Sequence, residues 1–63
     1  MTGDEMRAIR KRMGMSAVEF GRALGYRSSY NTIKVKIQRY ERFKEVPAPV
    51  VVRVRGLEQA RTR

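Results

Sequence analysis

The sequence lacks the side chains that most often carry catalysis and bind metals. Its 63 residues include no cysteine and no histidine. Without them the chain has no disulfide, no thiol nucleophile and none of the usual zinc ligands. It also has no pair of carboxylates at a catalytic spacing and no glycine-rich loop of the kind that holds phosphate groups. We therefore expect a protein that is not an enzyme and uses neither a metal nor a cofactor.

Long apolar runs are missing as well. No run approaches the roughly 20 apolar residues that cross a bilayer, and basic residues between Arg7 and Arg12 interrupt the segment where a signal peptide would be apolar. We expect a cytoplasmic protein without membrane contact. The length predicts a single domain, residues 1–63. A domain of this size buries only about 60% of the surface of its unfolded chain, so a second copy often supplies further burial.

Acidic residues are scarce: 6 Asp and Glu oppose 15 Lys and Arg, which gives a net charge of +9. Between residues 27 and 44 the single acid is Glu41. The same segment carries three aromatic side chains and the cations Arg27, Lys34, Lys36, Arg39, Arg42 and Lys44. This density favours a surface that binds nucleic acid. The alternative is a basic face that only contacts solvent.

Two helices are predicted by repeated start and stop signals. Thr2 with Glu5, and Ser16 with Glu19, have the spacing of a capping box. Gly14 and Gly25 follow the apolar periodic residues and are expected to end the helices. We predict helices over residues 3–13 and 17–24. Gly21 lies inside the second helix, where it either allows another helix to approach closely or is a tolerated defect.

A third helix is predicted over residues 30–42. Ile33, Ile37 and Tyr40 follow the i, i+4, i+7 spacing of a buried stripe. Successive residues of a helix are 100° apart, so the side opposite this stripe is expected to carry Val35, Gln38, Arg39 and Arg42.

The last segment is ambiguous between helix and strand. Alternation of valine and arginine over residues 51–55 suits a strand, whereas Pro49 suits the first turn of a helix. We favour a helix over residues 49–60. The fold class is therefore predicted as all-α, a compact bundle of four to five helices that contains a helix-turn-helix and a lengthened connection before the recognition helix.

The order of these elements resembles the helix-turn-helix family of Cro and phage repressors, the xenobiotic-response-element class. The resemblance is carried by residues 10–16 (RKRMGMS), 19–25 (EFGRALG), 37–42 (IQRYER) and 46–50 (VPAPV). Two departures concern recognition. The connection before the third helix is longer by about six residues than the family's tight turn, so either that helix begins earlier or a loop bulges out. Ala17 stands where many relatives have a glutamine that braces the recognition helix.

The resemblance implies a transcriptional repressor that binds double-stranded DNA as a homodimer on an inverted repeat. It also implies autoregulation in a phage, a mobile element or a restriction–modification locus. Arg10 and Glu41 resemble the ion pair that links the first helix to the end of the third in this family; the alternative is two surface charges that never meet. Two rival functions stay open: a protein–protein module on the same scaffold, and a basic binder of nucleic acid without sequence preference.

Candidate site residues lie mostly on the third helix. Arg39 can donate two hydrogen bonds to guanine and Val35 can pack on a thymine methyl group. The candidates for base contact are Asn31, Lys34, Val35, Gln38 and Arg39. The candidates for phosphate contact, which hold register without reading sequence, are Arg27, Ser28, Ser29, Thr32, Lys36, Arg42 and Lys44. Capping of the third helix is the alternative role for the hydroxyl and amide side chains among them.

A dimer interface is predicted in the apolar tail, because one helix face has little room to bury so many aliphatic side chains. The candidates are Phe43, Val50, Val51, Val54 and Leu57. The competing outcome is that the valines complete the core of the monomer or form a strand across the dimer.

Overall fold

In the computed structural model, residues 1–61 are described and form four helices with no strand among them. These are α1 (Gly3–Arg12), α2 (Ala17–Ala23), α3 (Tyr30–Tyr40) and α4 (Ala48–Arg61). The prediction of an all-α fold is confirmed, and each helix lies within two residues of its predicted bounds. The alternative strand at residues 51–55 does not form. Residues 62 and 63 of the predicted domain lie outside the described residues. None of the four helices is long and apolar enough to cross a membrane.

The two predicted capping boxes are both formed. Thr2 Oγ1 accepts from the amide of Glu5 at 3.1 Å while the Glu5 carboxylate accepts from the amide of Thr2. Ser16 and Glu19 make the same pair of bonds at the start of α2. Gly14 and Gly25 have φ angles of 68° and 100°, the left-handed region that favours glycine. These local signals set where α1 and α2 begin and end.

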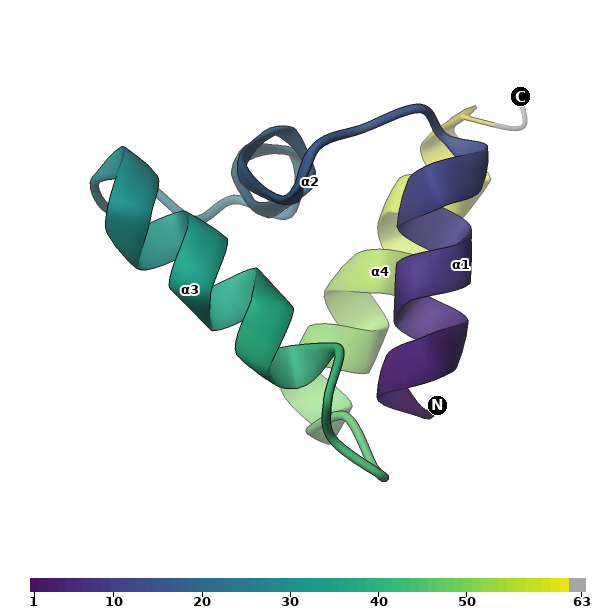
Figure 1. Cartoon of the computed structure of the whole chain (residues 1–63). Helices are drawn as coiled ribbons and strands as arrows, with labels where there is room; N and C mark the ends of the chain where they lie inside the picture. The colour runs from purple at the N-terminus through teal and green to yellow at the C-terminus, as the bar shows by residue number, and fades with distance from the viewer. Residues whose placement is uncertain (62–63) are drawn as a thin grey trace.

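The core is one cluster to which all four helices contribute. Met6 and Ile9 of α1 meet Phe20 of α2, Ile33 and Ile37 of α3, and the inner side of α4. In Figure 1, α1 and α4 lie beside each other, and α3 runs from the side of α2 down to α4. The carboxyl end of α3 is close to the start of α1, where the Gly3 amide donates to the carbonyl oxygen of Phe43 at 2.8 Å. This arrangement leaves one long side of α3 without a covering element.

Gly21 explains how closely α3 packs on α2. A Cβ atom at this position would collide with Cγ2 of Ile33 and lie 3.2 Å from Cγ1 of Ile37. The missing side chain therefore lets α3 pack directly against α2. This is the first of the two roles predicted for Gly21, in which it allows another helix to approach closely. The contact fixes which side of α3 turns inward and which turns out.

Two predicted dimer contacts are corrected by the core. Val50 and Val54 are buried within the monomer, where they belong to the core cluster. They are therefore unavailable to a second copy. This is the competing outcome, in which valines of the tail complete the core of the monomer. Val51 and Leu57 are half buried and pack on the same cluster. Phe43 remains 37% exposed, and Val52 at 71% is the most exposed large apolar side chain of the described residues.

Candidate nucleic-acid interface

The uncovered side of α3 carries the predicted base-contacting residues. Because Ile33 and Ile37 turn inward, the side chains one to two positions from them turn to solvent. All five candidates are exposed: Asn31, Lys34, Val35, Gln38 and Arg39. The helical pattern thus places polar, cationic and aliphatic groups along a single surface, as the sequence predicts.

The charge on this surface has no acid to neutralise it. Of the cations between residues 27 and 44, none forms an ion pair within residues 1–61. The only acid of the segment, Glu41, turns instead toward Arg10, whose Nε lies 2.7 Å from Oε2 and whose Nη2 donates to Oε1 at 3.3 Å. The predicted ion pair is therefore formed, and it removes the one carboxylate that could have offset the positive charge.

Arg10 also connects α1 to the start of α2. Its Nη1 donates to the carbonyl oxygen of Met15 at 3.0 Å, and its side chain is 15% exposed beside an 8% exposed Glu41 side chain. One guanidinium thus ties together the end of α3, the α1–α2 turn and α1. This pair orients α3 because breaking it would leave a largely buried charge without a partner.

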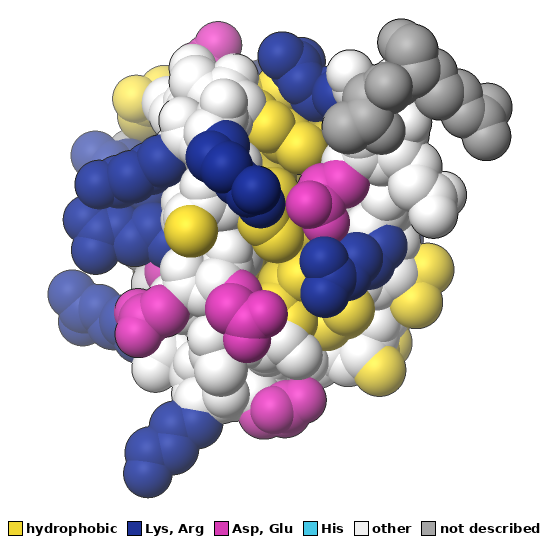
Figure 2. Space-filling view, turned by 90° about the vertical axis from the view of Figure 1, so that its right-hand side faces the viewer, with side chains coloured by type: hydrophobic (Ala, Val, Ile, Leu, Met, Phe, Trp, Pro, Cys, Tyr) yellow, Lys and Arg dark blue, Asp and Glu magenta, His cyan; other side chains and the backbone are white. Residues whose placement is uncertain are grey.

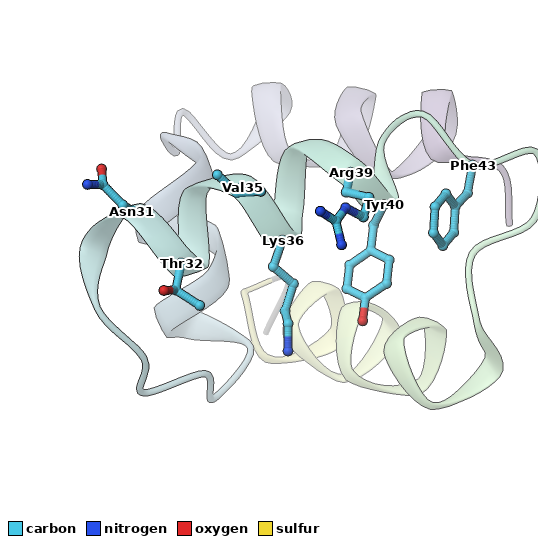
Figure 3. A pocket seen from close by; sticks show the side chains of 7 residues that line it. All are labelled: Asn31, Thr32, Val35, Lys36, Arg39, Tyr40 and Phe43. Atoms are coloured by element: carbon cyan, nitrogen blue, oxygen red, sulfur yellow. The ribbon is translucent and has the colours of Figure 1, made fainter.

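A groove runs along one flank of α3 (Figure 3). It has a volume of about 570 Å³ and is lined by Asn31, Thr32, Val35, Lys36, Arg39, Tyr40 and Phe43. Tyr40 and Phe43 meet edge to face, with ring centroids 5.5 Å apart. Cationic and apolar groups therefore alternate along the groove, which suits a ligand with both a charged and an apolar component.

A second, smaller depression lies on the outward side of the helix. It is lined by Val35, Gln38, Arg39 and Arg42 and has a volume of about 260 Å³. Next to it, Arg7 of α1 shares a depression with Gln38 and Arg42. Arg7 is exposed and adds a cation to the surface. Sequence reasoning missed it because its proximity to α3 depends on how α1 packs.

Lys36 differs from the other cations of α3. Its ammonium lies 4.9 Å from the centre of the Tyr26 ring, and its side chain is half buried. In Figure 3 it extends from the helix toward α4, away from Asn31 and Val35. The cation–π contact accounts for this direction. Lys36 therefore borders the groove at its flank, and its predicted contact with phosphate stays a prediction.

The connection between α2 and α3 is non-helical over residues 24–29, and α3 begins at Tyr30, as predicted. Arg27, Ser28 and Ser29 are exposed on it. Ser29 is the residue before the first turn of α3, yet its side chain makes no capping bond to the backbone. Its hydroxyl instead hydrogen-bonds that of Thr32, with the oxygens 2.9 Å apart. Both hydroxyls remain at the surface, where a phosphate oxygen can reach them.

Arg53 of α4 holds the start of this loop. Its Nη1 donates to the carbonyl oxygen of Leu24 at 2.8 Å, and its guanidinium lies 5.5 Å from the centre of the Tyr26 ring. Partial burial is the main cause that raises the pKa of the Tyr26 phenol, and the neighbouring Tyr40 adds to it. Sequence reasoning missed Arg53, because no local pattern links residues 29 positions apart.

The opposite side of the molecule has a different charge arrangement (Figure 2). There Arg12 of α1 lies 3.7 Å from Glu58 of α4, and Arg55 lies 3.0 Å from the same carboxylate. Acidic and basic side chains adjoin each other on this face, with apolar atoms exposed between them. Some of the cations on this side therefore have an acidic partner, whereas the cations along α3 have none among residues 1–61.

No family model matches this chain, and no curated protein or solved structure is significantly similar to it.

Proposed function

We propose that the protein is a transcriptional repressor that binds double-stranded DNA in a sequence-specific manner. In this proposal α2 and α3 act as a helix-turn-helix, and α3 enters the major groove. The observation that carries it is the outward side of α3, where the cations have no acidic partner among residues 1–61 while Glu41 is engaged by Arg10. A polyanion is the ligand that such a surface attracts.

The order of side chains along α3 supports this use. Five of the seven phosphate-contact candidates flank the helix, Arg27, Ser28 and Ser29 before it and Arg42 and Lys44 after it, whereas Thr32 and Lys36 lie on the helix itself. The base-contact candidates lie between the two flanking groups. An 11-residue helix is about 16 Å long at 1.5 Å per residue, and the major groove is about 12 Å wide. The ends of α3 would therefore meet the two phosphate backbones while its middle faces the base edges.

We further propose that two copies bind an inverted repeat and block access of polymerase to a promoter, including the promoter of the protein's own gene. Two recognition helices about 34 Å apart would then read successive turns of DNA. With Val50 and Val54 buried, the predicted contacts left for pairing are the exposed Phe43 and the half-buried Val51 and Leu57, and Val52 is a further exposed valine of α4. A dimer through so few groups would form weakly in solution and gain stability on DNA, where both copies are held.

The test is selection of DNA from a random pool by the purified protein at stated salt, followed by affinity measurement. We expect an enriched motif with two-fold symmetry, two protomers per duplex, and affinity for the motif at least about 1000-fold above a shuffled sequence. A reporter driven by a promoter containing the motif should then be repressed. Equal affinity for selected and shuffled DNA would contradict the proposal and favour a basic binder without sequence preference. No affinity for any DNA would favour the protein–protein module.

A further inference from the structure

Val35 is the only aliphatic side chain of α3 outside the core. Ile33 and Ile37 are fully buried, whereas Val35 is 51% exposed in the middle of the basic surface. It adds nothing to core packing, and a β-branched residue is a weaker helix former than alanine or a long polar residue. The stability of the fold therefore gives no reason for a valine at this position.

Val35 and Arg39 are close neighbours on the surface. They are four residues apart on one helix, which separates them by about 6 Å along its axis. Both line the large groove on the flank of α3 and the smaller depression on its outward side. Figure 3 shows the guanidinium of Arg39 beside the helix between Lys36 and Tyr40, with Val35 one turn earlier. A ligand that occupies either hollow touches both side chains.

The two side chains have complementary chemistry toward base edges. A guanidinium donates two hydrogen bonds to O6 and N7 of guanine, and an aliphatic group contacts the C5-methyl group of thymine. Arg39 is free to do so, since it forms no ion pair within the described chain. Base pairs stack about 3.4 Å apart, so a separation of 6 Å spans one to two steps.

We propose that Val35 and Arg39 together read a thymine and a guanine that lie within two base pairs of each other in each half-site. Arg39 fixes the guanine and Val35 excludes water from the methyl group of the thymine. The inference rests on the proposed binding of DNA and specifies which base groups α3 recognises. It also gives Val35 a role in DNA recognition, whereas the packing of the core gives it none.

The experiment replaces each thymine of the selected half-site, one at a time, with uracil, which lacks only the methyl group. Affinities are measured for the wild-type protein, for Val35→Ala and for the matched control Lys34→Ala. At one thymine near the guanine, the wild type should bind the uracil duplex roughly fourfold more weakly, the value of one buried methyl group. Val35→Ala should bind both duplexes equally. Lys34→Ala should bind both more weakly but keep the fourfold ratio.

Three results would overturn the inference. One is specific binding by the wild type with no thymine sensitive to loss of its methyl group. Another is a fourfold ratio that persists in Val35→Ala, which would assign the methyl contact to another residue. The third is a sensitive thymine that lies more than two base pairs from the guanine lost in Arg39→Ala. In each case the selected motif still stands, so failure of the inference is distinct from failure of the proposed function. Circular dichroism of Val35→Ala should be unchanged, because the side chain is half exposed.

Discussion

The arginines of α1 and α4 and the cations around α3 differ in what surrounds them. Arg10, Arg12 and Arg55 pair with Glu41 and Glu58, and Arg53 donates to the backbone at Leu24. The cations between residues 27 and 44 have no acidic partner among residues 1–61. Four further exposed cations form no ion pair in the described chain: Arg7, Lys11, Arg22 and Arg61. Of these, Arg7 shares a depression with Gln38 and Arg42 of the α3 surface. We infer that the paired cations stabilise the fold and that the unpaired cations of α3 bind a ligand.

The largest effect should come from breaking the most buried pair. Arg10→Ala leaves the Glu41 carboxylate largely buried without its cation and frees the carbonyl of Met15. We expect a loss of about 3 kcal/mol in the free energy of unfolding. Arg42→Ala, which removes an exposed and unpaired cation, should change it by less than about 0.5 kcal/mol. Urea denaturation of both variants measures the difference. Equal urea midpoints would show that the paired and the unpaired cations do not differ in their contribution to stability.

Arg39→Ala should change DNA recognition and leave stability unchanged, whereas Arg10→Ala lowers stability. We expect it to unfold at the same urea concentration as the wild type, because Arg39 makes no contact that supports the fold. Its binding should lose about 1–3 kcal/mol of discrimination at one base pair per half-site. Repeating the selection with this variant measures the change. An unchanged selected motif would show that Arg39 contacts phosphate alone.

Arg53→Ala should have a smaller effect that is confined to one region. It removes the hydrogen bond to Leu24 and the cation above Tyr26, so we expect a loss of about 1 kcal/mol of stability. Hydrogen exchange should quicken in the loop over residues 24–29 more than in α1. The matched control is Arg55→Ala, whose partner Glu58 lies on α4 itself. Equal exchange in the two variants would mean that Arg53 does not hold the loop.

The smallest expected effect is a pH-dependent change in stability from the capping boxes at the amino-terminal ends of α1 and α2. The backbone amides of Thr2 and Ser16 hold the pKa of the Glu5 and Glu19 carboxyls below the usual range. A lowered pKa in the folded state means that this stabilisation is complete above the unfolded pKa of about 4.3 and is lost as pH falls through the folded value. Thermal unfolding between about pH 5 and pH 3 should therefore shift less in a Glu5→Gln, Glu19→Gln double variant than in the wild type.

Local signals were sufficient to predict the helices. The capping boxes and the glycines at positions 14 and 25 act within a few residues, and the inward stripe of Ile33 and Ile37 follows from helical periodicity alone. The outward side of α3 was predictable for the same reason. Burial of Val50 and Val54 was predicted only as the competing outcome to a dimer interface, because it depends on how α4 packs on the rest of the core.

Long-range contacts account for the parts of the candidate interface that the sequence did not predict. Arg53 meets the loop across 29 positions of the chain, Arg7 reaches the surface through the packing of α1, and Lys36 is directed by the ring of Tyr26. Each depends on how helices cross, and no spacing within one segment encodes it. The six-residue loop itself was predicted only as one of two alternatives, since its length alone does not say whether α3 begins earlier.

The most direct test of the account is the salt dependence of DNA binding in variants of the two groups of cations. We measure log affinity against log salt between about 50 and 200 mM on the selected duplex, for the wild type and for Lys44→Ala, Arg42→Ala, Arg12→Ala and Arg55→Ala. Each cation that displaces counterions from a phosphate contributes about 0.9 to the slope. The account predicts a steep wild-type slope that falls by about one per subunit in Lys44→Ala and Arg42→Ala and stays unchanged in Arg12→Ala and Arg55→Ala. A wild-type slope near zero, or an equal fall in all four variants, would contradict it.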